Sequence, residues 1–392
     1  MKSIEKLAIV GGTPLFDHCI ADGQQFFPSW EQYESLFRDI FERQYYTNHG
    51  PLAQLLEQKL AEQLNVKHAI CVTNGFIGLA LAGQALGVTG RVVVPANTHV
   101  ATIQSLDWTH AKPLICDVDE SGMLTAEILE PILASHNDIS AVLAVNLWGD
   151  CCELTALEQL TARYGIALYF DSAHGFGCEF NGKPLGGFGS LEVMSLNASN
   201  IVTSAEGGVI CTQSDDLAAH IRNIRSNYGM GYPVVVEKTS NGRMSEAQAG
   251  IALHSLDALD NHRERNEKLF NLLGVCLKEI PGLHLRYPQK VSKSNFQNIV
   301  LEVDSREFGL SCEYLSKILR SENLITQRGF SPYACFSQIY KGCVVDLLPV
   351  TQKMAESILI VPFSALFTED LLVATAEKLK IIHQFASVLT DI

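Results

Sequence analysis

The chain has 392 residues, a formal net charge of -14 at pH 7, and 47% hydrophobic residues. This length and composition predict a compact globular protein with room for two domains that share a core. The acidic charge argues against nucleic acid or an anionic membrane as the main partner, because both would repel such a surface at long range.

The sequence shows no sign of a membrane or secretory segment, and its cysteines form no obvious framework. No apolar run approaches the roughly 20 residues that a membrane-spanning helix needs, and the first residues lead into no secretory apolar core. The eleven cysteines include no Cys-x-x-Cys pair, which is typical of scattered reduced thiols. We therefore expect a cytoplasmic protein without a metal site.

Short apolar runs alternate with amphipathic stretches, which is the pattern of strands and helices in an α/β fold. Helices are predicted over residues 75–86 and 100–108. Their spacing relative to the strands predicts a mostly parallel sheet with helices on both faces. The predicted strands span residues 69–72, 91–94, 113–117, 142–145, 167–171, 191–195 and 208–211.

The sequence changes character after about Leu253. A long charged helix over residues 257–278 leads into a smaller region, with strands at 299–303 and 358–362 and a closing helix at 371–387. We therefore expect a large domain over residues 1–252, including the N-terminal segment. Residues 253–392 then form the linking helix and a smaller C-terminal α+β domain.

Ligands of open parallel sheets bind at the carboxyl ends of the strands, so the residues after each strand are the first candidates for a site. Gly75 and Phe76 begin a helix directly after a strand, where free backbone N–H groups and the helix dipole can hold a phosphate. The preceding Asn74 also makes an Asn-Gly pair with Gly75, which is an ordinary turn signal.

Asp171 follows an apolar strand. A buried carboxylate there can pair with a protonated heterocyclic nitrogen and keep it charged, although a strand-end Asp also caps turns. His99 offers a flat ring near the same strand ends and can stack on a planar cofactor or act as a hydrogen-bonded structural residue. His174, three residues after Asp171, can equally be a polar residue of the core.

Several segments together resemble the DegT/DnrJ/StrS family of sugar aminotransferases, which use pyridoxal phosphate. The resemblance covers nearly the whole chain and includes the residues around Asn74 and Asp171. It is carried by residues 11–14, 73–75, 95–102, 170–175, 206–208, 241–246 and 361–362.

The resemblance implies the type I fold of pyridoxal phosphate enzymes: a homodimer with a large sheet domain, a small C-terminal domain and active sites at the subunit interface. A nucleotide-activated sugar is the implied substrate. Asp171 resembles the partner of the pyridine nitrogen, and His99 lies where an aromatic ring usually stacks on the cofactor. His174 falls where a Gln or His normally lies close to that ring.

The family pattern also assigns roles outside the ring-binding residues. Ser195 and the backbone of Gly75 and Phe76 resemble phosphate ligands. Asn227 and Asn241 look like residues that reach the active site of the partner subunit.

The segment from Ser195 to Gly208 departs from the family at its most important position. Asn200 stands where the family carries the lysine that holds the cofactor as a Schiff base and moves a proton. An amide has no comparable nucleophilic lone pair and does not titrate near neutral pH. Asn197 also stands where His is common, and Phe76 replaces a frequent Thr.

Three interpretations remain open. In the first, pyridoxamine or pyridoxal phosphate binds without a covalent tether and the protein promotes elimination, or another non-transaminating reaction, of a nucleotide-linked keto-sugar. His99 or His174 would then be the base, since Asn200 cannot serve. In the second, the chain is a catalytically inactive binding or regulatory homologue. In the third, it is an ordinary sugar aminotransferase in which Asn200 is an engineered replacement of lysine.

Overall fold

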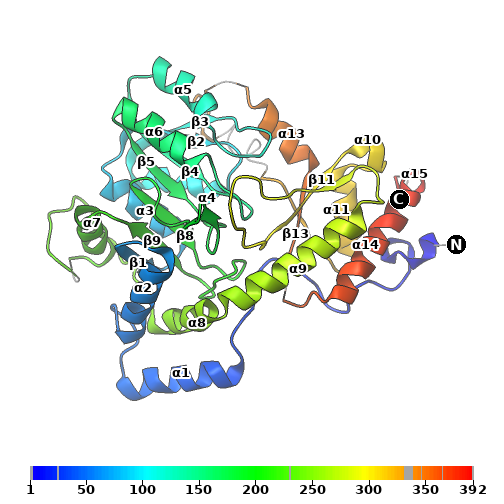
Figure 1. The fold of residues 1–392 in the computed structure, drawn as a ribbon, viewed down its shortest axis with the longest axis horizontal. Coiled ribbons are helices and arrows are strands. Elements are labelled where there is room, and N and C mark those ends of the chain that lie inside the picture. Colours follow the sequence, from blue (N-terminus) through cyan, green and yellow to red (C-terminus); the bar gives the residue numbers. More distant parts are fainter. Residues whose placement is uncertain are drawn as a thin grey trace.

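The computed structural model describes residues 3–23, 26–228, 231–330, 339–345, 347–363 and 365–390. Its larger part is built on a seven-stranded sheet in the order β1-β9-β8-β5-β4-β2-β3 (Figure 1). Neighbouring strands from β8 to β3 are parallel, whereas β9 runs antiparallel to both β8 and β1. The predicted mostly parallel sheet is confirmed. The strands are β1 (His68–Val72), β2 (Thr89–Pro95), β3 (His110–Cys116), β4 (Ile139–Val145), β5 (Ala167–Asp171), β8 (Leu191–Ser195) and β9 (Gly208–Thr212).

Both faces of this sheet are buried. Successive side chains of a strand point to opposite faces, so Val92 and Val94 join one apolar cluster while Val93 joins the other. Helices supply the rest of each cluster. They are α2 (Pro51–Leu64), α3 (Gly75–Ala85), α4 (Val100–Gln104), α5 (Ala126–Ser135), α6 (Leu154–Tyr164), α7 (Asp215–Arg225) and α8 (Glu246–Asp257), with a 3-10 turn at Ser105–Trp108 and a hairpin of β6 (Glu179–Phe180) and β7 (Lys183–Pro184).

Helix α9 (Leu259–Leu277) runs from the large sheet to a smaller, antiparallel sheet in the order β10-β11-β13-β12 (Figure 1). This matches the charged helix and the two strands that the sequence predicts there. The strands are β10 (Leu283–Leu285), β11 (Ile299–Val303), β12 (Gln327–Arg328) and β13 (Ile358–Val361). The helices are α10 (Ser305–Phe308), α11 (Cys312–Ser321), α13 (Pro349–Ser357), α14 (Glu369–Gln384) and α15 (Ala386–Leu389).

The N-terminal segment packs with the smaller sheet, not with the large one as expected from the sequence. Leu7, Phe16 and Ile20 belong to the same apolar cluster as residues of α9, α11 and α14. The buried carboxylate of Glu322 accepts hydrogen bonds from the backbone nitrogens of Ala8 (2.8 Å) and of Leu15 (2.9 Å). The grouping of residues before α1 (Trp30–Arg43) with the large domain is therefore wrong, while the boundary near residue 253 stays a prediction.

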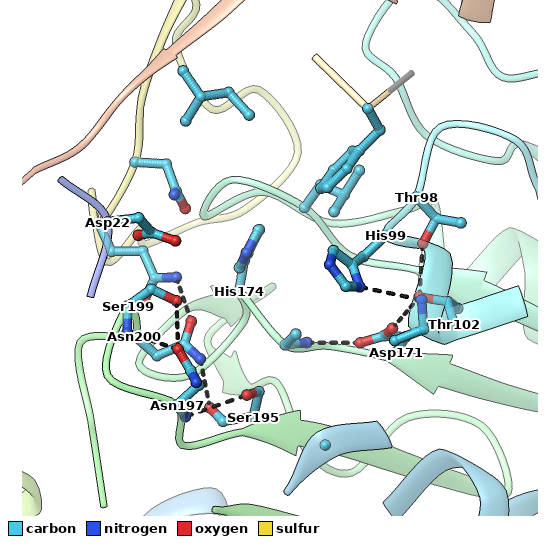
Figure 2. A pocket seen from close by; sticks show the side chains of 18 of the residues that line it. Asp22, Thr98, His99, Thr102, Asp171, His174, Ser195, Asn197, Ser199 and Asn200 are labelled. Carbon is cyan, nitrogen blue, oxygen red and sulfur yellow. Dashed lines mark hydrogen bonds between the residues drawn. The ribbon is translucent and has the colours of Figure 1, made fainter. Parts of the chain in front are cut away.

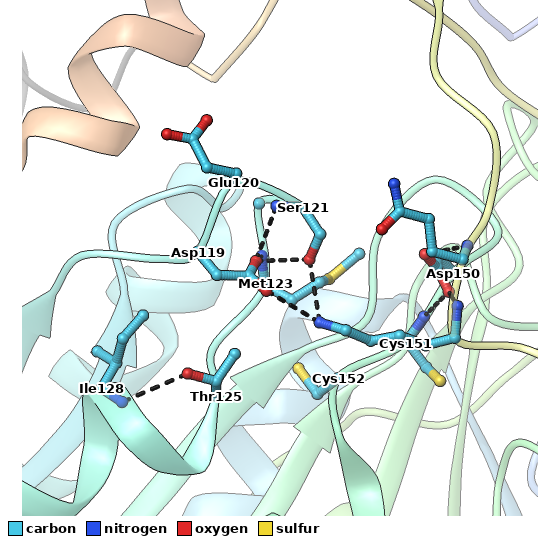
Figure 3. A network of polar contacts seen from close by, with 12 residues as sticks. Asp119, Glu120, Ser121, Met123, Thr125, Ile128, Asp150, Cys151 and Cys152 are labelled. Atoms are coloured by element: carbon cyan, nitrogen blue, oxygen red, sulfur yellow. Dashed lines mark hydrogen bonds and ion pairs between the residues drawn. The ribbon is translucent and has the colours of Figure 1, made fainter.

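A polar network fixes the segment that leads into β11 against the loops of the large sheet (Figure 3). Asp150 accepts hydrogen bonds from the backbone nitrogens of Gln289 (2.8 Å) and Lys290 (2.9 Å). The Lys290 Nζ donates to Asp119 Oδ2 (3.1 Å) and Ser121 Oγ (3.0 Å). These contacts hold residues 289–298 beside the carboxyl ends of β4 and β5, where the candidate site lies.

Candidate functional site

A cavity of about 410 Å³ lies at the carboxyl ends of β5 and β8 and at the first turns of α3 and α4 (Figure 2). Most of the residues singled out from the sequence line it. They are Gly75, Phe76, His99, Asp171, His174, Ser195 and Asn200.

Two predicted residues do not line this cavity. Asn227 and Asn241 are both exposed, and Asn241 pairs through a single β-bridge with Ser226, the residue before Asn227. The structure thus places these two positions beside each other on the surface of the chain. Their predicted contribution to a partner's active site stays a prediction.

Asp171 forms one end of the cavity (Figure 2). Its Oδ2 accepts a hydrogen bond from Thr102 Oγ1 (2.7 Å), and its Oδ1 accepts one from the backbone nitrogen of Ala173 (3.1 Å). Thr98 Oγ1 donates in turn to Thr102 Oγ1 (2.9 Å), which orients the Thr102 hydroxyl toward the carboxylate. Two neutral donors therefore hold the Asp171 side chain in place.

The charge of Asp171 is not balanced by these contacts. Burial raises the pKa of Asp171 above its ordinary value, opposed by the hydrogen bonds from Thr102 and Ala173 and by the nearby His99. A cationic N–H of a ligand would remove this burial penalty and would be kept protonated by the carboxylate. The arrangement fits a protonated heterocyclic nitrogen.

The start of α3 forms a second binding element. The Asn74 Oδ1 accepts a hydrogen bond from the backbone nitrogen of Ile77 (2.9 Å), which leaves the N–H groups of Gly75 and Phe76 for a ligand. A Cβ atom at Gly75 would lie 3.2 Å from the Ser195 Cβ, so a larger residue there would need Ser195 to shift by a few tenths of an ångström. These N–H groups and the Ser195 hydroxyl form a cradle that fits a phosphate.

His174 lies between the two ends of the cavity (Figure 2). Its Nδ1 accepts a hydrogen bond from the backbone nitrogen of Trp148 (3.3 Å). Burial lowers the pKa of His174 to about 4, with a smaller effect from His99. The ring is therefore neutral near pH 7 with its proton on Nε2, so it presents a donor and not the basic lone pair that the sequence interpretation allowed.

His99 is more exposed than His174. It caps α4, because its Nδ1 accepts a hydrogen bond from the backbone nitrogen of Ala101 (3.2 Å). Its ring packs edge-to-face on Phe330, with 6.2 Å between the ring centroids. The contact holds the ring of His99 beside the cavity, and its stacking on a cofactor stays a prediction.

Asn200 is tied on both sides. Its Nδ2 donates to the backbone oxygen of Ser195 (3.0 Å), and its Oδ1 accepts from Gln297 Nε2 (3.0 Å). Gln297 Oε1 accepts in turn from the backbone nitrogen of Ile201 (3.0 Å). Both amide side chains are only 2% exposed. We call this chain of hydrogen bonds, formed by Asn200 and Gln297 with the backbone of Ser195 and Ile201, the amide clamp.

Sequence reasoning missed Gln297 and did not single out Thr102. Thr102 follows His99 by three positions on the first turn of α4, so the local pattern contained a signal for it. Gln297 comes from the segment before β11, 97 positions away from Asn200. No local pattern in the sequence connects these two residues.

The charged residues that line the cavity, among the described part of the chain, are acidic apart from the two histidines. They are Asp22, Asp171 and Glu206. Asp22 and Glu206 are exposed and accept hydrogen bonds from Gln327 Nε2 (3.2 Å) and Asn197 Nδ2 (2.8 Å) respectively. In the part of the chain that the structure describes, no helix is long and apolar enough to cross a membrane. The same residues contain no group of three or more His, Cys, Asp or Glu side chains that could hold a metal ion.

The sequence of this chain is similar to those of known aminotransferases. The profile of the DegT/DnrJ/EryC1/StrS aminotransferase family matches residues 30–380. The dTDP-4-amino-4,6-dideoxy-D-glucose transaminase of Shigella dysenteriae is 30% identical over 366 residues, which are 90% of this chain and 97% of that protein. GDP-perosamine synthase of Caulobacter vibrioides is 32% identical over 221 residues, 54% of this chain and 58% of that protein.

Solved structures show the same fold. DesI, determined in the presence of its TDP-sugar product, superposes with a TM-score of 0.91 at 30% identity, covering 98% of this chain and 97% of that one. The E. coli GDP-4-keto-6-deoxy-D-mannose-3-dehydratase with bound hydrated pyridoxal phosphate has a TM-score of 0.81 at 18% identity, covering 92% of this chain and 100% of that one. At 18% identity the likeness shows the fold alone.

Proposed function

The chain belongs to the DegT/DnrJ/EryC1/StrS aminotransferase family, and on that premise we propose that it binds pyridoxal or pyridoxamine phosphate without a covalent tether. The proposed substrate is a nucleotide-linked keto-sugar, and the proposed reaction is an elimination or another conversion that is not ordinary transamination. One observation carries this proposal: the buried carboxylate of Asp171 lies at one end of a cavity whose other end holds Asn200, an amide that cannot form a Schiff base with the cofactor.

The residues present fit the cofactor at three points. The phosphate would be held by the N–H groups of Gly75 and Phe76 with the Ser195 hydroxyl, and the ring nitrogen by Asp171. His99 would lie against the ring. When bound, the cofactor supplies the reactive carbonyl or amine and a ring that withdraws electrons from the substrate carbon.

The chain's own residues then orient the ligand and move protons. His174 donates from Nε2 while its Nδ1 stays bound to the Trp148 N–H. His99 is the proposed proton-transfer residue, because its ring is exposed to water. In this role its Nδ1 would have to release the Ala101 N–H before it could accept a proton. General acid–base help of this kind typically contributes about 10²–10⁴-fold.

We further propose a homodimer. Helix α1 buries only Ile40, and Trp30 (67%) and Phe41 (59%) are widely exposed on it. Aromatic side chains from Trp30 through Tyr33 and Phe37 to Phe41 follow one another along this helix. An exposed aromatic row of this kind fits an interface with a second copy, to which Asn227 and Asn241 would also contribute.

A catalytically inactive binding homologue is the second candidate function. In both His99 and His174, Nδ1 accepts a hydrogen bond from a backbone N–H group. Neither neutral imidazole therefore has a free lone pair with which to accept a proton, and this favours an inactive homologue. Turnover of a nucleotide-linked keto-sugar by the loaded protein would exclude this candidate.

The experiment that tests the proposal is an absorbance titration of the protein with pyridoxal phosphate and, separately, with pyridoxamine phosphate. The proposal expects saturable binding without the absorbance band of a lysine Schiff base. Asn200→Lys is measured in parallel. Gain of amino transfer from glutamate to a keto-sugar by this variant is the result that an engineered replacement of lysine predicts. A lysine Schiff-base band in the native protein would contradict the proposal.

A further inference from the structure

Backbone groups at both ends fix the direction of the hydrogen bonds in the amide clamp. The backbone oxygen of Ser195 can only accept, and the backbone nitrogen of Ile201 can only donate. Between them, Gln297 must therefore present Oε1 to Ile201 and Nε2 to Asn200. A flip of either side-chain amide would set two donors or two acceptors against each other.

This order determines what the clamp offers to the cavity. Each amide oxygen already accepts a hydrogen bond within the chain, whereas each amide nitrogen donates one hydrogen and keeps a second. Asn200 and Gln297 both line the cavity and both are 98% buried. The clamp is thus a pair of buried N–H donors, and a buried donor without an acceptor is costly.

We propose that Asn200 and Gln297 bind the carbonyl oxygen of pyridoxal phosphate, so that the resting site prefers the aldehyde form of the cofactor to the amine form. This inference rests on the proposed function and deepens it. An aldehyde oxygen accepts hydrogen bonds from both amide nitrogens. The protonated amine of pyridoxamine phosphate is itself only a donor, and the amide oxygens that it would meet in the clamp already accept hydrogen bonds within the chain.

The acidic residues of the cavity do not reverse this preference. Asp22 and Glu206 are exposed, so solvent and salt screen their charges, and each already accepts a hydrogen bond from a side-chain amide. Asp171 lies at the opposite end of the cavity, where it is bound by Thr102 (Figure 2). Asp22 and Glu206 therefore attract cations to the exposed part of the cavity, and Asp171 attracts a protonated ring nitrogen. None of the three changes the donor character of the clamp.

The test compares the dissociation constants of pyridoxal phosphate and pyridoxamine phosphate, measured by isothermal titration calorimetry on the full chain. We expect the native protein to bind the aldehyde form at least about tenfold more tightly, the difference that one well-placed hydrogen bond typically makes. Gln297→Glu replaces a donor with a carboxylate, so it should shift this ratio at least about tenfold toward the amine form.

Gln327→Glu is the matched control. It makes the same substitution in the lining of the same cavity, but at an exposed residue outside the clamp. We expect it to change the ratio less than about threefold, because solvent screens its charge. Thermal unfolding verifies that each variant is folded, and Asn200→Asp replaces Gln297→Glu if the latter does not fold.

The outcomes are distinguishable. Equal binding of the two forms by the native protein, or an equal shift of the ratio in Gln327→Glu and Gln297→Glu, overturns the inference and leaves the proposed function intact. Failure of the native protein to bind either form overturns the proposed function itself.

Discussion

The two ends of the cavity differ in whether their polar groups are satisfied within the chain. At one end, Asp171 is a buried carboxylate with two neutral donors and a raised pKa. At the other, Gln297 donates to the Asn200 oxygen and the backbone nitrogen of Ile201 donates to the Gln297 oxygen. The first end carries a charge that a cationic ligand would balance, whereas both amide oxygens of the second end already have partners in the fold.

Under the proposed function, this difference would separate binding of the cofactor from its covalent attachment. The carboxylate that would hold a pyridine ring is present, while Asn200 forms a structural contact between the large sheet and the segment before β11. We therefore expect variants at the two ends of the cavity to lose different properties. Changes at Asp171 should affect ligand binding, and changes in the clamp should affect stability.

The largest expected effect is on cofactor affinity in Asp171→Asn. Loss of the carboxylate removes an ion pair with the ring nitrogen, which we expect to weaken binding about 100-fold, or about 2.7 kcal/mol. The unliganded variant should be at least as stable as the native protein at pH 7. Burial raises the pKa of Asp171, so ionisation of this carboxyl group opposes folding.

Calorimetric titration and urea unfolding of the same preparations measure both quantities. Because the pKa of Asp171 is higher in the folded chain than in the unfolded chain, the native protein loses stability as the pH rises through this pKa. The difference in stability between Asp171→Asn and the native protein should therefore shrink toward acidic pH. Unchanged affinity in Asp171→Asn would mean that this residue does not contact the cofactor.

The next effect is on stability in Gln297→Leu. This variant leaves the Asn200 oxygen and the Ile201 N–H buried without partners, which we expect to cost about 2 kcal/mol in the free energy of unfolding. Urea unfolding measures this loss. The matched change Gln327→Leu, at an exposed position, should alter stability by less than about 0.5 kcal/mol. Equal losses in the two variants would show that the clamp does not stabilise the fold.

His174, between the two ends, predicts a pH dependence of stability. Its pKa is about 4 in the fold and its ordinary value is 6.5, so the unfolded chain takes up a proton first as pH falls. Stability is therefore lost between about pH 6.5 and about pH 4. His174→Gln keeps an acceptor for the Trp148 N–H but does not titrate. We expect this variant to lose about 1–2 kcal/mol less stability on acidification than the native protein, a value reduced because part of the His174 ring reaches the cavity.

Urea unfolding of both proteins at about pH 7 and pH 5 checks this expectation. If the native protein and His174→Gln lose stability in parallel on acidification, His174 is not held neutral in the fold.

The smallest expected effect is at the start of α3. Asn74→Ala removes the N-cap and should cost about 1 kcal/mol in stability. The same change should weaken binding of a phosphorylated cofactor, because the Gly75 and Phe76 N–H groups are then less well oriented. Binding of inorganic phosphate or pyridoxal phosphate, compared with that of unphosphorylated pyridoxal, separates the two effects. An equal loss of affinity for pyridoxal would show that this helix start does not bind the phosphate.

The sequence predicted the Asp171 end of the cavity and missed half of the other end for a physical reason. The carboxyl ends of parallel strands meet at one edge of a sheet, so a carboxylate after β5 and a glycine after β1 can be placed near each other from local patterns alone. Gln297 reaches Asn200 because contacts between distant segments, among them those of Asp150 and Lys290, hold its segment against the large sheet. Such contacts between distant segments leave no periodic signal.

The N-terminal segment illustrates the same limit. The spacing of Leu7, Phe16 and Ile20 fits neither a helix nor a strand, so it does not indicate which surface they pack against. Their packing with α11 and α14 depends on formation of the smaller sheet. The expectation that this segment joins the large domain followed chain order. Position along the chain was a poor guide to which core these residues enter.

Intact mass spectrometry after borohydride reduction of the pyridoxal phosphate-loaded protein distinguishes a cofactor held without a covalent bond from one attached to a lysine. We expect saturable binding of one cofactor per chain before reduction and an unchanged protein mass after it. A stoichiometric mass gain from a reduced pyridoxyl group on a lysine of the native chain, or the absence of saturable binding, would contradict this expectation.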